Sequence, residues 1–348
     1  MASFDALIGE NKRNTVLLVA VVTLVFCLLA AAIGLVVFGW ESQSQNVTVM
    51  SHSRTYHDVI EAHQEYQGPS FAFVLAISIG AAIAVAAIMT LFSYFGGAAA
   101  LMAVSHAREI QKSDDPQLWN VIEELSLAAG LPMPRVYLID EPAMNAFATG
   151  RDPKHAAVAI TAGLRQKLTR DELQGVMAHE LSHVRNYDIR LTMFAAVMAG
   201  VVVLMADLFL RYLWFGGGQR RDSNSRGGNP LQLILLIFAI VLAILAPIFI
   251  KIIQLAISRQ REYMADAAGV ALTRYPEGLI SALRKLETDE EPLHAVTRAT
   301  AHLFIVNPLK AEDQRSHLKA SNLFQTHPDL EDRIARLQSI GTAAAPGK

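Results

Sequence analysis

Two long runs without a charged side chain constrain this chain more than any other feature, because each is long enough to cross a membrane. The first extends from Thr15 to Phe38 and the second from Phe71 to Phe95. Hydrophobic residues make up 52% of the chain and are concentrated in such runs rather than spaced periodically. We therefore expect a multi-pass membrane protein in contact with the lipid bilayer, with transmembrane helices at 15–39 and 71–95. A cleaved signal peptide fits the first run poorly, since that run is too long and follows a polar stretch.

Basic residues predict the orientation of these two helices. Lys12 and Arg13 precede the first run, and Arg108 and Lys112 follow the second. The segment between them has Arg54 as its one basic residue. Because basic residues favour the cytoplasmic side, residues 1–14 should be a cytoplasmic N-terminus and 40–70 an outer loop of an inner (plasma) membrane protein.

The segment His179-Glu180-Leu181-Ser182-His183 predicts a metal site. Two histidines four residues apart on a helix face the same side and can bind one metal ion. The intervening Glu180 is placed to accept a proton from water that the metal activates. A capping-box pattern at Thr169–Glu172 and apolar residues at helical spacing favour a helix here. The alternative is a buried helix whose histidines satisfy each other or the backbone.

A third ligand is needed, and Glu262 is the candidate. The one cysteine, Cys27, lies in an apolar run and is not placed to supply it. Glu262 and Asp266 are one helical turn apart, so Asp266 could orient a ligating histidine. A solvated, charged helix face is the alternative for this pair.

The HELSH and EYMAD segments together resemble those of the HtpX-type membrane zinc endopeptidases, relatives of the CAAX prenyl proteases. Asn145–Gly150 and Thr326-His327-Pro328 match further segments of that pattern. The resemblance implies one zinc ion bound by His179, His183 and Glu262, with Glu180 as general base and Asp266 in support. The orientation predicted from the basic residues places this active site on the cytoplasmic side, and the resemblance implies that it cleaves misfolded or damaged membrane proteins in quality control and the stress response.

The two outer segments carry further expectations. The resemblance places Asn145, Ala146 and Phe147 beside the substrate, where an extended peptide could pair with an exposed strand edge. Asn145 could equally shape a turn. His327 is a candidate to stabilise the oxyanion formed during peptide hydrolysis, or it packs before Pro328. Arg333 is expected to form a structural salt bridge rather than a catalytic contact.

Two more apolar stretches, Leu191–Leu210 and Leu231–Ile250, separate the two halves of the predicted metal site. Both halves must lie on one side of the membrane, so the 191–257 hairpin crosses twice or not at all. We expect two crossings, as transmembrane helices 3 and 4. The basic residues between them favour the alternative, a hairpin that does not cross; they are Arg220, Arg221 and Arg226.

The soluble segments 103–190 and 258–340 should form one protease domain split by this hairpin, followed by a flexible tail at 341–348. Strands are predicted at Arg135–Ile139 and Ala156–Ile160. Helices are predicted at 116–129, 278–287 and 330–340. The predicted fold class is a mainly α membrane protein carrying an α+β, gluzincin-like zinc metalloprotease domain with a small sheet.

Other classes of function fit the residues less well. A nucleic-acid partner is not expected, because 30 basic and 32 acidic side chains nearly balance. A non-catalytic scaffold that keeps zinc for folding would not need Glu180. A metal transporter would place its ligands within apolar spans. CAAX-type substrates are less expected with two to four spans. The substrates are expected to be membrane proteins or peptides, and the sequence leaves the oligomeric state open.

Overall fold

The computed structural model describes residues 4–44, 68–216, 259–293, 300, 303–306 and 328–343. Its contacts divide the chain into two compact units. One unit combines Met1–Leu18, Thr90–Val201 and Ile248–Lys348, and the other combines Val19–Met89 with Val202–Pro247. The predicted fourth apolar stretch lies outside the described residues.

Among the described residues, two helices are long and apolar enough to cross a membrane. Helix α1 spans Phe4–Ser44 and contains the candidate span Ile8–Leu28, so it begins before the predicted boundary at residue 15. Helix α2 is itself a candidate span, Phe71–Val104. In the second unit the two helices are in contact, since a Cβ added to Gly34 would lie 2.8 Å from Ser78 Oγ.

The first unit contains a mixed four-stranded sheet with the order β1-β2-β4-β3. Its strands are β1 (Arg108–Glu109), β2 (Arg135–Ile139), β3 (Ala146–Gly150) and β4 (Ala156–Thr161). β2 and β4 run parallel, and β1 and β3 pair antiparallel on the outer sides. β2 and β4 agree with the predicted strands, and β3 extends along the segment that we expected beside the substrate.

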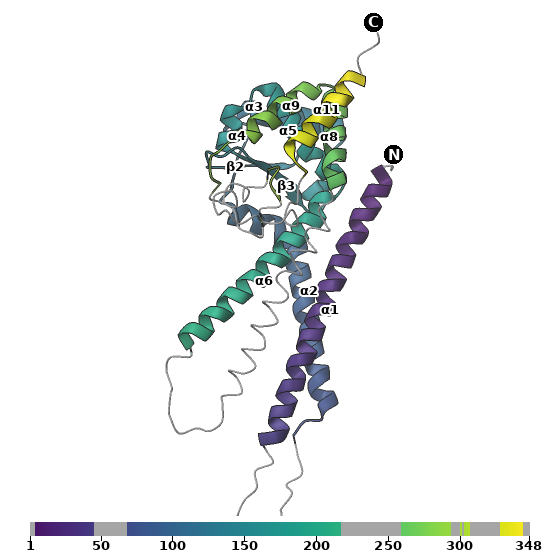
Figure 1. Cartoon of the computed structure of the whole chain (residues 1–348), viewed down its shortest axis with the longest axis vertical. Coiled ribbons are helices and arrows are strands. Elements are labelled where there is room, and N and C mark those ends of the chain that lie inside the picture. The colour runs from purple at the N-terminus through teal and green to yellow at the C-terminus, as the bar shows by residue number, and fades with distance from the viewer. Residues whose placement is uncertain are drawn as a thin grey trace, which may run out of the picture. The chain divides into compact units, whose positions relative to one another are not determined.

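Seven helices of the described residues belong wholly or partly to this unit after α2 (Figure 1). They are α3 (Pro116–Ala129), α4 (Ala162–Lys167), α5 (Arg170–Arg185), α6 (Asp188–Gly216), α8 (Arg259–Thr273), α9 (Pro276–Glu287) and α11 (Leu330–Ala343). Local chemistry sets the ends of α3, where the Asp115 carboxylate accepts the Leu118 N–H and Gly130 ends the helix with a φ of 66°.

Helix α5 is central to the first unit, because it contacts α3, α8, α9 and β3. Its apolar side chains are fully buried, with Leu173, Val176 and Met177 each 0% exposed. Burial of this kind stabilises each side chain by about 1.5–3 kcal/mol, so α5 is held rigidly from several directions. Two glycines allow close approach of its neighbours: Gly175 meets Leu279 of α9, and Gly269 of α8 meets His179.

Candidate metal centre

Helix α5 places two histidines one turn apart on a buried face. Thr169 caps the helix by accepting the Glu172 N–H, and the Glu172 side chain accepts the Thr169 N–H, which confirms the predicted capping box. His179 and His183 follow in the last two turns, with side chains 1% and 15% exposed. The helix therefore directs both imidazoles into the interior of the unit.

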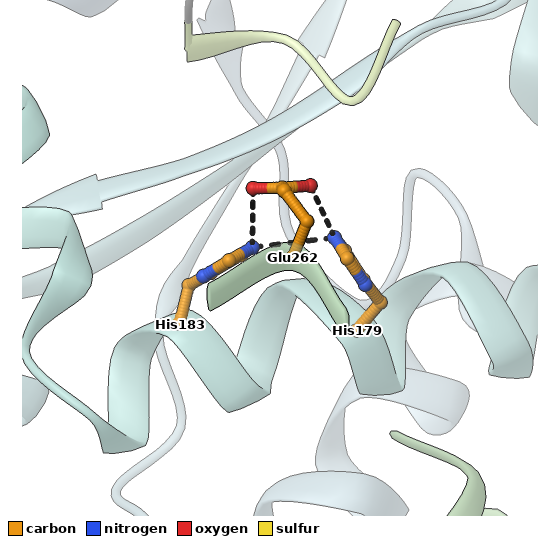
Figure 2. Close-up of side chains that lie close together, drawn as sticks. All are labelled: His179, His183 and Glu262. Carbon is orange, nitrogen blue, oxygen red and sulfur yellow. Dashed lines mark hydrogen bonds and ion pairs between the residues drawn. The ribbon is translucent and has the colours of Figure 1, made fainter. Parts of the chain in front are cut away.

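Glu262 on α8 completes a group of three potential ligands (Figure 2). Its Oε2 lies 3.7 Å from His179 Nε2 and its Oε1 lies 3.7 Å from His183 Nε2. The two Nε2 atoms are 3.2 Å apart. One ligand atom from each residue lies within 4.8 Å of the others, so this group could hold a metal ion.

The opposite nitrogen of each imidazole meets a carboxylate. His179 Nδ1 lies 2.8 Å from Asp266 Oδ1, and His183 Nδ1 lies 2.9 Å from Asp188 Oδ2. A carboxylate accepts hydrogen bonds, so in a neutral imidazole it holds the proton on Nδ1 and leaves the Nε2 lone pair unprotonated. With both imidazoles neutral, three electron-pair donors converge. A cation suits this arrangement, and two nitrogens with one carboxylate oxygen are a donor set that zinc accepts.

The charges around His183 favour a positive group at this point. Burial alone would lower the pKa of His183, but the hydrogen bond with Asp188 and the negative charge of Glu262 raise it to about 9. Without a metal, a proton therefore compensates the nearby carboxylates. A metal ion must displace that proton, so metal binding at this site releases protons and strengthens as pH rises.

Glu180 lies beside the group but is directed differently. Its side chain is buried, and its carboxylate accepts a hydrogen bond from the main chain of Ala148 in β3. Burial raises the pKa of Glu180, while the neighbouring His179 and His183 oppose that rise. A raised pKa brings a carboxylate closer to the range in which it can both accept and return a proton.

Arg333 of α11 supports the far side of His179. Its guanidinium donates to both oxygens of Asp266, at 2.9 and 2.6 Å, which confirms the predicted salt bridge. Arg333 Nη2 also lies 3.3 Å from His179 Nδ1. Arg333 Nη2 and His179 Nδ1 both donate to Asp266, so they cannot bond each other. The shorter contacts from each of them to the Asp266 carboxylate are the hydrogen bonds.

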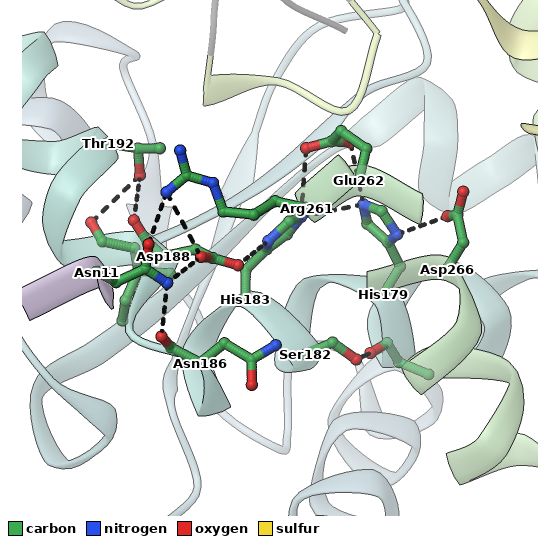
Figure 3. A network of polar contacts seen from close by, with 12 residues as sticks. Asn11, His179, Ser182, His183, Asn186, Asp188, Thr192, Arg261, Glu262 and Asp266 are labelled. Carbon is green, nitrogen blue, oxygen red and sulfur yellow. Dashed lines mark hydrogen bonds and ion pairs between the residues drawn. The ribbon is translucent and has the colours of Figure 1, made fainter. Parts of the chain in front are cut away.

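A second polar cluster lies on the Nδ1 side of His183 and consists of Asp188, Asn11 and Arg261 (Figure 3). The sequence alone does not indicate that these residues belong to the site. Asp188 begins α6 after a tight junction in which Tyr187 has a φ of 61°. A carboxylate soon after the second histidine was the one available signal. Its approach to His183 depends on this junction, which residue spacing does not reveal.

Asn145, Ala146 and Phe147 lie near this centre but their side chains are buried. The Asn145 amide donates to Val306 O at 2.9 Å, and the Ile305 N–H donates to Ala146 O at 3.0 Å. These contacts fasten residues 303–306 to the outer side of β3. Phe147 packs edge-on against Phe304 with ring centroids 4.9 Å apart. The predicted His327 lies outside the described residues.

Comparisons with known proteins agree with this geometry. The family described as Peptidase family M48 matches residues 112–341. A "Protease HtpX homolog" of Lactobacillus helveticus is 48% identical over 69% of this chain and 78% of its own length. One of Streptococcus uberis is 40% identical over 96% of this chain and 98% of its own.

A solved structure, "Crystal Structure of S. mikatae Ste24p", matches with a TM-score of 0.40 and 21% identity, covering 77% of this chain and 58% of that one. The M48 family match covers residues 112–341, and the Streptococcus uberis relative extends along nearly the whole sequence. This chain belongs to peptidase family M48 and is an HtpX-type membrane metalloprotease.

Proposed function

We propose that this membrane metalloprotease holds one zinc ion with His179, His183 and Glu262 and cleaves misfolded or damaged membrane proteins at the cytoplasmic face. The observation that carries the proposal is the convergence of two Nε2 atoms and one carboxylate beside a buried glutamate. Zinc held there would act as a Lewis acid on the scissile carbonyl and make water easier to deprotonate. The chain's own residues supply the remaining chemistry.

Glu180 is the proposed general base. Its carboxylate accepts a proton from the attacking water and then delivers that proton to the departing amine. The hydrogen bond from Ala148 fixes the position of this carboxylate relative to β3. Asp266 and Asp188 keep the two imidazoles in the tautomer that presents Nε2. We retain His327 as a proposed stabiliser of the oxyanion.

An extended substrate is proposed to dock along the outer edge of β3. Alternate residues of a strand direct their main-chain groups to the same edge, and β4 pairs with the inner edge of β3. The Thr161 N–H of β4 donates to Asn145 O, so the alternate residues Ala146 and Ala148 present their main-chain groups outward. Ile305 already bonds Ala146, whereas Ala148 lies next to Glu180. Because the Ala148 N–H bonds Glu180, a substrate N–H would donate to the Ala148 carbonyl, with Asn145 and Phe147 shaping this edge.

The contacts of the N-terminal residues support an active site on the cytoplasmic side. Asn11 in α1 bonds Asp188 directly, and residues 1–18 belong to the same compact unit as the metal centre. The side predicted for Lys12 and Arg13 is therefore the side proposed for the active site.

The test is cleavage of an unfolded membrane-protein reporter by purified protein loaded with zinc. Glu180→Gln should retain zinc and lose at least about a hundredfold in cleavage rate, because general-base catalysis contributes about 10²–10⁴-fold. Metal content is measured on both samples. Equal cleavage by wild type and Glu180→Gln would refute the role of Glu180 and indicate a contaminating protease.

A further inference from the structure

A buried asparagine in the first helix contacts the residues that surround the metal centre. Asn11 belongs to α1 and is 2% exposed. Its partners at the junction of α5 and α6 lie 175 and 177 residues further along the chain. A buried carboxamide needs hydrogen-bond partners for two donor hydrogens and an acceptor oxygen. The partners of Asn11 therefore indicate what this side chain does.

Both amide hydrogens and the carbonyl oxygen of the Asn11 side chain have hydrogen-bond partners at this junction. Its Nδ2 donates to Asp188 Oδ1 at 2.5 Å and to Asn186 O at 2.9 Å. Its Oδ1 accepts from Arg261 Nη1 at 2.6 Å, as Figure 3 shows. A reversed amide would place NH₂ against the guanidinium and oxygen against two acceptors. The surroundings therefore fix a single orientation of this side chain.

These partners lead directly to two of the three proposed ligands. Asp188 uses its other oxygen, Oδ2, to hold His183 Nδ1 at 2.9 Å. Arg261 immediately precedes Glu262 on α8. Asn11 thus connects the helix that carries Glu262 to the carboxylate that orients His183.

We propose that Asn11 is a positioning residue of the metal centre: its amide fixes the Asp188 carboxylate, which fixes the tautomer and ring orientation of His183. This inference rests on the proposed zinc site. It makes the N-terminal segment part of the protease machinery rather than only a cytoplasmic tail ahead of a membrane anchor.

The proximity of Arg261 explains why the amide is needed. Arg261 Nη1 lies 4.0 Å from Asp188 Oδ1, with Asn11 bonded to both groups. Without the carboxamide, the guanidinium can pair with Asp188 directly and draw its carboxylate away from His183. The amide keeps the cation and the carboxylate apart and gives each a defined partner.

Zinc affinity tests the inference, measured by competition with a chromophoric chelator on full-length protein in detergent. All variants carry Glu180→Gln, so that self-digestion does not alter the samples. Asn11→Ala should weaken zinc binding about tenfold, the lower end of the range for residues that support metal ligands. The visible spectrum of the cobalt-substituted protein should change as well, since it reports ligand geometry.

An exchange variant separates positioning from folding. Asn11→Asp places two carboxylates against each other and should weaken zinc binding more than Asn11→Ala. Adding Asp188→Asn removes the contact between two carboxylates and lets the new amide donate to position 11, so affinity should recover in part, because the donor to Asn186 O is still missing. Thr15→Val is the matched control, because buried Thr15 lies one turn along α1 and its hydroxyl bonds Asn11 O within that helix.

The outcomes distinguish the inference from the proposal beneath it. His183→Ala must weaken zinc binding; unchanged affinity would refute the zinc site and the inference with it. If His183→Ala weakens binding but Asn11→Ala binds zinc as well as the Glu180→Gln parent, the positioning role is overturned, even if the metal-free variant is less stable. Should Asn11→Ala fail to fold, an exchange variant that binds zinc no better than Asn11→Asp overturns it equally.

Discussion

Arg333 has the largest fully buried side chain of the described residues, and a charge in that position depends on its partners. Burial alone would raise the pKa of Asp266, but the charge of Arg333 and the hydrogen bond from His179 lower it to about 2. Glu262 Oε2 lies 3.8 Å from Arg333 Nη1. The arginine therefore balances two carboxylates around His179, and its removal leaves buried negative charge uncompensated.

We predict that Arg333→Met lowers the free energy of unfolding of the metal-free protein by about 3–5 kcal/mol, the cost of breaking a buried ion pair from one side. Denaturant unfolding in detergent measures the change. Arg336→Met is the control on the same helix, because exposed Arg336 lies over the Tyr263 ring at 3.7 Å and should cost about 0.5–1 kcal/mol. Equal losses for the two variants would contradict this account.

At the scale of elements, Glu172 joins the start of α5 to α9. Its carboxylate completes the capping box and also accepts from Ser281 Oγ at 2.6 Å and Lys285 Nζ at 2.7 Å. Burial would raise the pKa of Glu172, but these hydrogen bonds lower it to about 2. The ionised carboxylate thus fixes the helix that carries both histidines against its neighbour.

A pH dependence follows from this lowered pKa. The ionised form stabilises the fold fully above the ordinary value of 4.5, and its contribution is lost as pH falls from there toward 2. Glu172→Gln should therefore lower the free energy of unfolding near pH 7 by about 1–2 kcal/mol, a value reduced for the 40% exposure of the Lys285 side chain. The difference in the free energy of unfolding between the two proteins should be constant from pH 7 to about 5 and should narrow as pH falls toward 3. A constant difference across that range would rule out the ionic contribution.

The crossing of α5 and α9 depends on a glycine. A Cβ added at Gly175 would lie 2.7 Å from Leu279 N and 2.9 Å from Leu279 Cα. These are backbone atoms, which cannot move aside without shifting α9. Gly175→Ala should therefore destabilise the protein by about 1–3 kcal/mol, although alanine intrinsically favours a helix. Gly9→Ala in α1 is the control, since nothing lies within 4 Å of its added Cβ. Thermal unfolding of both variants in detergent tests the difference, and similar midpoints would contradict a tight crossing.

Elements with local signals were predictable and those that depend on pairing were not. Asp115, Pro116 and Gly130 mark the ends of α3, and its observed bounds equal the predicted ones. The two-residue strand β1 has no pattern of its own and exists because Arg108 and Glu109 pair with β2. The six-residue helix α4 was also missed, since a helix this short lacks a full apolar repeat.

At the scale of the whole molecule, labelling of single cysteines tests the sidedness of the active site. Replacing the one native cysteine by Cys27→Ser gives a background for new ones. Cysteines at exposed Glu10 and at Leu127, which is 78% exposed, should react from the cytoplasmic side. Ser53→Cys in the predicted outer loop should react from the opposite side. Labelling of Glu10→Cys and Leu127→Cys from different sides would contradict the contact between Asn11 and Asp188.

The site was predictable where its residues are close in sequence. His179, Glu180 and His183 share one helix, and Glu262 shares another with Asp266, so helical spacing indicates each pair. Asn11 carried no such signal, because its partners Asn186 and Asp188 lie 175 and 177 residues further along the chain. Helical periodicity describes one face of one element, whereas the surroundings of His183 arise from contacts between elements.

The ion pair of Arg333 with Asp266 also bears on the order in which the protein is made. Arg333 belongs to the last described helix, so it leaves the ribosome after every other residue identified around the metal centre. Until then Asp266 lacks the cation that fixes it, and His179 lacks a fully held carboxylate. The support of His179 should therefore be complete only once α11 has been translated, later than both histidines and Glu262.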